Sequence, residues 1–126
     1  MVEENQKKLQ AEIDLYKQIQ KDYHKALVKR QQLDGQLNEN SAVKEELDLL
    51  KSGNEVFKLI GPVLVKQDLV EAKQNVAKRM EYISNELKRT EELITDLDKK
   101  QETHRETLDK LQQLFQQAQL KATKKP

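Results

Sequence analysis

Two histidines and many carboxylates are the side chains of this sequence that could support acid–base or metal chemistry. With the two helical stretches paired as described below, His24 and His104 lie roughly 12 Å apart along the helices. His104 faces Tyr16 in an apolar seam, where a packed or hydrogen-bonded histidine is a simpler interpretation than a metal ligand. The 22 Asp and Glu residues are spread over solvated faces, whereas acid–base catalysis needs a desolvated pair. We therefore expect no catalytic residue and no metal site.

The sequence also lacks the patterns expected for binding a cofactor or nucleic acid and for spanning a membrane. There is no glycine-rich phosphate loop, since Gly61-Pro62 predicts a turn. The 23 Lys and Arg residues are interspersed with the acidic ones, so no basic footprint for nucleic acid forms. Cysteine is absent, the first residues lack signal-peptide features, and no apolar run approaches the roughly 18 residues of a membrane span. These features predict a cytoplasmic protein without a cofactor.

The composition predicts long helices that pair along a seam. Charged residues make up 36% of the chain and aromatic residues 4%, which leaves few large side chains for a globular core. Residues 4–52 contain no Pro, and seam positions recur at alternating steps of three and four, which is typical of a coiled coil. The expected seam positions are Leu9, Ile13, Tyr16, Gln20, Tyr23, Leu27, Arg30, Asp34 and Leu37. Near residues 38–41 the phase slips, and Val43, Leu47 and Leu50 continue in a new frame, which predicts a discontinuity.

Residues 68–120 predict a second helix, with neither Gly nor Pro and no slip in its ladder. The expected seam positions are Val76, Met80, Ile83, Leu87, Thr90, Ile94, Leu97, Gln101, His104, Leu108, Leu111, Phe115 and Ala118. The two ladders, found separately, agree on one antiparallel register, which places Leu27 opposite Ile94 and Leu37 opposite Ile83. The same register places Gln20 opposite Gln101 as a polar layer. We therefore expect a single domain in which the chain folds back on itself.

The segment 54–67 supplies the reversal. Two apolar, β-branched runs flank Gly61-Pro62, which predicts a β-hairpin. Gly53 suits the left-handed conformation that follows a helix end, and Asp68 with Glu71 predicts a cap at the start of the second helix. Residues 121–126 are expected to form a disordered tail. The expected fold is mainly α: a long antiparallel two-helix coiled-coil hairpin with a small β-hairpin at the connecting end.

Both faces of this β-hairpin are largely apolar, and a two-stranded hairpin alone is marginally stable in water. Unpaired edges beside apolar faces are normally completed by another chain. The sequence therefore predicts oligomerisation through the hairpin; the alternative is that the segment is an ordinary loop. The residues expected at the oligomer interface are Val56, Phe57, Leu59, Ile60, Val63, Leu64 and Val65.

Several segments resemble prefoldin, specifically the β-class subunits, which have one β-hairpin between two helices. The most telling similarity runs from Val43 to Leu47 and from Asn54 to Asp68, and two further segments begin at Lys78 and at Arg105. The resemblance covers essentially the whole chain, although the helical flanks alone would match many coiled coils.

This resemblance implies a subunit of a hexameric co-chaperone made of α- and β-class subunits. Prefoldin captures unfolded actin, tubulin and other clients without ATP and passes them to the cytosolic chaperonin. Its clients are held at the distal ends of the helices, which implies a client-binding role for apolar side chains there. From geometry and residue type, the expected positions are Val2, Leu9, Leu114, Phe115 and Leu120.

Two alternatives stay open. Leu9 and Phe115 are equally well explained as ordinary seam residues near a helix end. A structural or tethering coiled coil would explain both ladders, but a tether could replace the apolar strands with any polar loop. The chaperone hypothesis therefore depends on the central segment.

Overall fold

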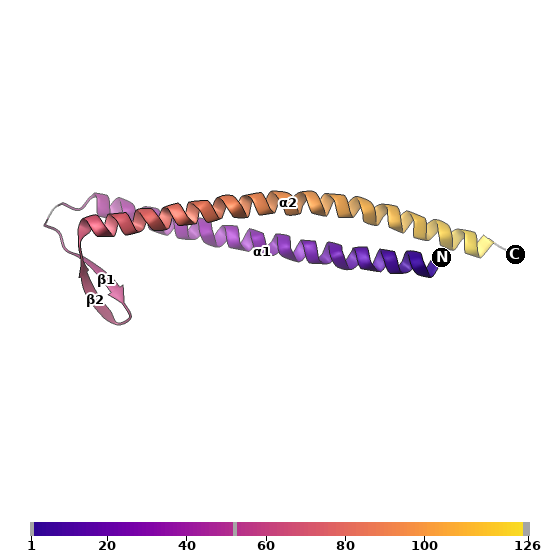
Figure 1. The fold of residues 1–126 in the computed structure, drawn as a ribbon, viewed down its shortest axis with the longest axis horizontal. Coiled ribbons are helices and arrows are strands. Elements are labelled where there is room, and N and C mark those ends of the chain that lie inside the picture. Colours follow the sequence, from indigo (N-terminus) through magenta and orange to yellow (C-terminus); the bar gives the residue numbers. More distant parts are fainter. Residues whose placement is uncertain (1, 52, 125–126) are drawn as a thin grey trace. The chain divides into compact units, whose positions relative to one another are not determined.

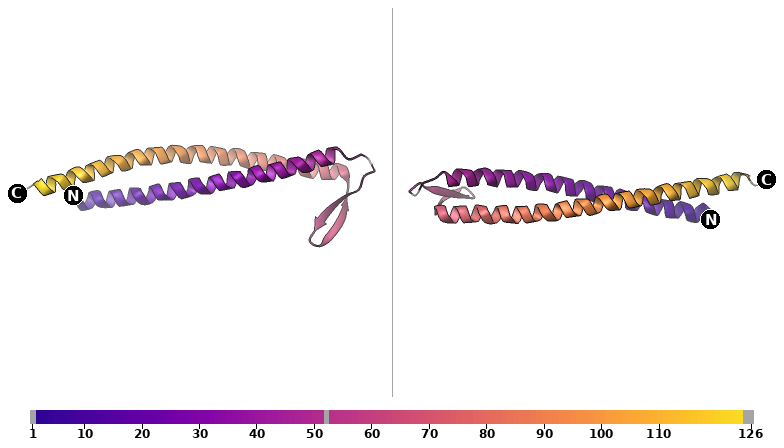
Figure 2. Two further views of the ribbon diagram at one scale, coloured as in Figure 1. Left: turned by 180° about the vertical axis from the view of Figure 1, so that it is seen from behind. Right: turned by 90° about the horizontal axis from the view of Figure 1, so that it is seen from above.

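The computed structural model describes the backbone of residues 2–51 and 53–124 and the side chains of residues 3–51 and 53–121. The order of elements is helix α1 (Val2–Asp48), strand β1 (Val56–Ile60), strand β2 (Val63–Gln67) and helix α2 (Leu69–Lys124). Figures 1 and 2 show these two long helices with the short strands between them. The expected fold class, a coiled-coil hairpin with a small β-hairpin at its connection, is therefore confirmed.

The chain divides into two compact units, which we describe separately. The terminal unit contains the residues up to Val28 and those from Glu92 onward, and the hairpin unit contains Lys29–Glu91. Each unit contains a part of α1 and a part of α2 running in opposite directions, and the hairpin unit also contains both strands.

The terminal unit has one buried apolar cluster. Ile19, Ala26 and Leu97 are buried, and Tyr23 and Ile94 pack against them. Tyr23 therefore shares a cluster with Leu97, as the predicted register requires. The start of α1 and the end of α2 lie at the same end of this unit (Figure 1).

The hairpin unit has two buried clusters. Leu33 packs with Ile83 and Leu87 in the first, with Leu37 against them, so Leu37 and Ile83 also share a cluster as predicted. The second cluster lies near the strands and includes both helices, the loop and strand β1. Its buried residues are Leu47, Ala72 and Val76, with Leu50, Val56, Leu69 and Met80 packed against them.

The α2 ladder is confirmed, because each of its thirteen positions is buried or half-buried. In α1 the predicted frame is wrong at two positions, because Gln20 and Asp34 are exposed whereas their preceding neighbours Ile19 and Leu33 are buried. Leu27 is half-buried, as a seam residue is, and the neighbouring Ala26 is fully buried. The polar layer between Gln20 and Gln101 is therefore absent. The mistake arises because apolar residues occur in both adjacent frames of α1, and only the position of α2 selects one of them.

The predicted phase slip at residues 38–41 is also wrong, because it depended on the incorrect frame assigned to α1. The buried positions Ile19, Ala26, Leu33 and Leu47 are separated by multiples of seven, so a single heptad frame continues through the segment. Helix α1 is uninterrupted there, and the half-buried Asn40 side chain donates a hydrogen bond to the Gln36 carbonyl at 2.7 Å.

Of the two helix ends near the strands, the end of α1 differs from prediction and the start of α2 has its predicted cap. Helix α1 ends at Asp48 instead of 52, where the Leu50 N–H donates to the Leu47 carbonyl (3.2 Å), a tightened last turn that brings Leu50 onto the cluster. At α2, the Glu71 N–H donates to Asp68 Oδ2 at 3.4 Å, so the predicted cap is present.

Glycines allow the two tight reversals of the connection. Gly53 has φ of 105° in a turn closed by the Asn54 N–H and the Lys51 carbonyl (3.1 Å), so it serves this turn rather than the helix end. Gly61 has φ of 56° at the first position of the two-residue loop between the strands, as the type II′ turn favoured in β-hairpins requires.

The far end of α2 also differs from prediction. The helix continues to Lys124, so residues 121–124 are not a disordered tail, and residues 125–126 lie outside the described part of the chain. Nothing in the sequence after Leu120 stops a helix before Pro126, and Ala and Lys are good helix formers.

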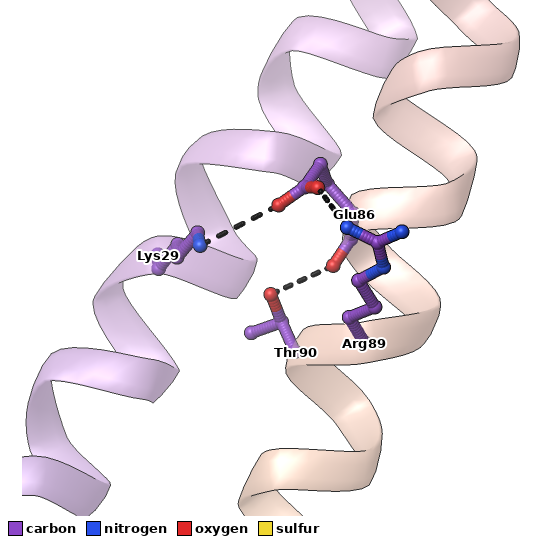
Figure 3. Close-up of polar contacts among 4 residues, drawn as sticks. All are labelled: Lys29, Glu86, Arg89 and Thr90. Atoms are coloured by element: carbon purple, nitrogen blue, oxygen red, sulfur yellow. Dashed lines mark hydrogen bonds and ion pairs between the residues drawn. The ribbon is translucent and has the colours of Figure 1, made fainter.

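A polar contact group joins the helices on one side of the hairpin unit (Figure 3). Glu86 from α2 receives Lys29 Nζ from α1 at 3.6 Å and Arg89 at 3.2 Å, and its side chain is only 18% exposed. The hydroxyl of the buried Thr90 donates to the Glu86 carbonyl at 2.8 Å, which satisfies this polar group in the seam.

Candidate functional site

The strands place the predicted interface residues on two faces of one small sheet. Strands β1 and β2 are antiparallel, with Leu59 opposite Leu64 and Ile60 opposite Val63. Since side chains alternate across a strand, Phe57, Leu59 and Leu64 share one face with Lys66. The opposite face carries Val56, Lys58, Ile60, Val63, Val65 and Gln67.

Most of these apolar side chains are exposed. Leu59 is 67% exposed and Leu64 is 65% exposed, and Phe57 is half-exposed. Ile60, Val63 and Val65 are exposed to a similar degree, although they lie on the opposite face. Only Val56 is covered within the chain, because it packs on the cluster around Leu47 and Val76. Six of the seven predicted interface residues thus form a surface without a partner in the described part of the chain.

The sheet edges add to this surface. Strand β1 pairs with β2 alone, and no other strand of the described residues joins the sheet. The outer backbone groups of both strands are therefore available for further pairing, which is the edge arrangement that proteins normally cover or complete. The sheet lies beside the helix ends of its own unit (Figure 2). A groove there is lined by residues of β1, β2 and both helices.

Sequence reasoning missed two exposed apolar residues that flank the strands. Leu49 follows the end of α1 and is 81% exposed, and Val70 in the first turn of α2 is 61% exposed. A signal for them was present, because both are apolar residues adjacent to seam positions at helix ends. They belong to the same unit as the hairpin and are two further exposed apolar side chains there.

The predicted client-binding residues lie in the terminal unit with mixed exposure. Leu114 and Leu120 are more than half exposed, whereas Leu9 and Phe115 are half-buried as seam residues are. The side chain of Val2 lies outside the described residues. The structure therefore brings two leucines to the surface of α2 near its end.

The two histidines have different surroundings. The half-buried His104 Nδ1 contacts the Glu12 carboxylate across the two helices of the terminal unit, instead of facing Tyr16 alone, and His24 is exposed. Sequence reasoning missed Glu12 because the predicted frame of α1 passed through Ile13. Among the described residues, no group of three or more His, Asp or Glu side chains is arranged to hold a metal ion.

No helix within the described ranges has an apolar stretch long enough to span a bilayer. Two surfaces of the described residues expose apolar side chains: the hairpin and the leucines near the end of α2. Both are suited to non-covalent association, since burial of exposed apolar surface is the main favourable term in protein–protein contact.

Comparison with known sequences gives consistent results over most of the chain. A family model described as prefoldin subunit matches residues 10–118. Prefoldin subunit 6 of Mus musculus and of Homo sapiens are each 56% identical over 119 residues, which cover 94% of this chain and 94% and 92% of those proteins. Prefoldin subunit 6 of Arabidopsis thaliana is 54% identical over 101 residues, which cover 80% of this chain and 78% of that protein.

Among solved structures, the fold is similar to the crystal structure of the prefoldin beta subunit from Thermococcus strain KS-1. The TM-score is 0.66, and the match covers 88% of this chain and 91% of that one. The sequence identity is 21%, so this likeness bears on the fold alone.

Proposed function

Because this chain belongs to the prefoldin family and is a subunit of that co-chaperone, we propose that it captures unfolded polypeptides and delivers them to the cytosolic chaperonin without ATP. The family implies a hexamer formed with other prefoldin subunits. The observation that carries the proposal is the exposed apolar β-hairpin, which a simple tether would not need. We propose the cytoplasm as the site of action and no catalytic role.

Assembly is proposed to use the seven hairpin residues Val56, Phe57, Leu59, Ile60, Val63, Leu64 and Val65. Their burial by α- and β-class neighbours would stabilise the complex by roughly 25 cal/mol for each Å² of apolar surface removed from water. The free strand edges would meanwhile gain backbone hydrogen bonds. Leu49 and Val70 lie beside this surface and are proposed to extend it.

Replacing an interface side chain by a charge tests this assignment. Phe57→Asp and Val65→Asp are expected to release the subunit from its complex, because each replaces an apolar side chain by a carboxylate whose removal from water the opposite Lys66 or Lys58 offsets only in part. Native mass spectrometry measures the assembly, and circular dichroism should show helicity mostly intact. Asn54→Asp is the matched control, since it adds the same single negative charge at an exposed residue of the nearby loop. A complex of unchanged mass carrying Phe57→Asp would contradict the proposal.

Client capture is proposed to occur near the free helix ends through Val2, Leu9, Leu114, Phe115 and Leu120. The exposed Leu114 and Leu120 support this, because weak apolar contacts from several subunits acting together can raise overall affinity by roughly 10²- to 10⁴-fold. Such dispersed contacts also suit release to a chaperonin without nucleotide hydrolysis.

Removing the chain from Leu114 onward is expected to weaken suppression of client aggregation while the complex retains its composition. Light scattering of an aggregating unfolded client measures capture, and native mass spectrometry measures assembly. A subtler variant, Leu114→Ser with Leu120→Ser, has Gln113→Ser with Gln116→Ser as its control on the same helix. Intact capture together with lost assembly would reverse the assignment.

A further inference from the structure

The hairpin unit has a groove lined by residues of both helices. None of the residues proposed for assembly or client capture lines it. It has a volume of about 460 Å³, within the range of roughly 300–1,000 Å³ that is usual for ligand sites. Its lining consists of Gln36, Asn40, Lys78, Arg79, Tyr82 and Ile83. The buried Ile83 provides an apolar floor, and the Tyr82 ring is 66% exposed beside two cations.

The surface continues from this groove toward the strands. Arg79 also lines a second groove of about 190 Å³, whose walls include Lys58 and Phe57 of β1 and Val43 of α1. Arg79 is the residue that the two grooves share. Because Val56 and Phe57 of the second groove are proposed to serve assembly, only the first groove is free of residues with a proposed role.

Neither groove has an acidic residue in its lining. In a chain with 22 acidic residues among 126, this segregation gives the surface a local positive charge. Glu39 and Glu81 neighbour lining residues in sequence, but neither of them lines a groove.

Lys78 and Arg79 have no ion pair with any described residue, and the same is true of Arg30, Lys44, Lys51 and Lys88 in this unit. The ion pairs of the unit are formed elsewhere: Lys29 and Arg89 contact Glu86, Lys66 contacts Glu55 and Lys73 contacts Asp48. Glu86 follows Tyr82 by one turn, but its carboxylate is engaged by Lys29 and Arg89 (Figure 3). The charge of the grooves is therefore not balanced from within the chain.

We propose that the first groove binds a short acidic segment of a partner protein, with a bulky apolar side chain of that segment seated beside Tyr82. The carboxylates would pair with Lys78 and Arg79, and the amides of Gln36 and Asn40 would bond its backbone. Two cations on an otherwise balanced chain are few for nucleic acid, which is bound through many phosphate contacts. The apolar floor matches a peptide side chain instead.

The test uses the assembled complex that contains this subunit. The probe is a short fluorescein-labelled peptide of glutamates with one central phenylalanine, and fluorescence anisotropy measures its Kd. Lys78→Glu with Arg79→Glu should raise Kd about tenfold, because two attractions become repulsions. Lys88→Glu with Lys100→Glu, the matched control on exposed parts of α2, should leave Kd within about twofold.

Two further binding measurements separate the contribution of charge from the contribution of apolar packing. Tyr82→Ala should weaken the peptide about threefold or more without changing the charge. Higher ionic strength should weaken binding to the native complex and should have less effect on the Lys78→Glu, Arg79→Glu variant. Suppression of client aggregation should be unchanged in all these variants, so failure here leaves the proposed client capture standing.

Four results would overturn the inference. The groove variant and the control variant could bind the acidic peptide equally, or a lysine-for-glutamate peptide could bind as tightly as the acidic one. A labelled oligonucleotide of equal charge could bind at Lys78 and Arg79 while the peptide does not. Lastly, the groove variant could lose subunits in native mass spectrometry, which would make another subunit of the complex the occupant.

Discussion

Leucines in two regions of the hairpin unit have opposite surroundings. Leu33 and Leu87 in the helical seam are each 8% exposed, whereas Leu59 and Leu64 in the strands are 67% and 65% exposed. The residue type is the same, but the seam leucines pack against each other across two helices, whereas the strand leucines, which lie opposite each other in the sheet, stay largely exposed. The comparison teaches that the helical seam is buried within the described part of the chain and the sheet is not, which supports the proposed assembly through the hairpin.

The largest expected effect compares truncation in the two regions. Leu87→Ala should lower the free energy of unfolding of the subunit by about 2–4 kcal/mol, because it leaves a cavity in a packed cluster. Leu59→Ala should change it by less than about 0.5 kcal/mol, since its side chain is largely hydrated already. Urea unfolding followed by circular dichroism measures both. Equal losses would mean that the sheet is packed within the subunit, which would break the comparison.

Replacement of glycine by alanine is expected to have smaller effects on stability, with opposite signs at Gly61 and Gly35. Gly61→Ala should destabilise the hairpin by roughly 1–2 kcal/mol, because an L side chain is strained at its φ of 56°. Gly35→Ala should stabilise α1 by about 0.5–1 kcal/mol, since its new methyl group meets no atom within 4 Å. The melting temperature of the subunit reports Gly35→Ala, and the midpoint of complex dissociation reports Gly61→Ala. Stabilisation by both variants would show that the hairpin turn is not constrained.

The smallest effect sharpens the comparison within the seam itself. His104 and Glu12 form a half-buried polar contact in the seam of the terminal unit, whereas the seam of the hairpin unit contains an apolar cluster with Leu33 and Leu87. A double-mutant cycle with Glu12→Gln and His104→Gln should give a coupling energy of about 0.5–1.5 kcal/mol. Glu3→Gln, at an exposed position of the same helix, is the control for the loss of charge. A coupling energy of zero would show that the seam there is held by apolar packing alone.

The two helices differ in how well their sequences predicted them. The α2 ladder from Val76 to Ala118 was predicted, because its seam positions recur without a slip, although the buried Ala72 was missed. In α1 the pairs Ile19–Gln20 and Leu33–Asp34 were assigned in the wrong frame. An isolated amphipathic helix tolerates either frame, and only contact with the ladder of α2 removes the choice.

The surfaces were predictable to different degrees as well. The apolar strands around Gly61-Pro62 and their assembly role followed from residue types alone, although that role stays a prediction until it is tested. The groove could not be predicted, because Gln36 and Asn40 on α1 meet Lys78 and Tyr82 on α2 only after the helices have paired. Leu49 was missed because its exposure depends on where α1 ends.

The sequence by itself determined that this chain forms two helices with one seam each and an apolar hairpin between them. Those features follow from periodicity and from glycine and proline, which act over a few residues. The tertiary structure alone decided which frame of α1 is buried, which carboxylate meets His104 and which cations stay unpaired. These depend on side chains far apart in sequence, whose contacts exist only once α1 and α2 lie against each other.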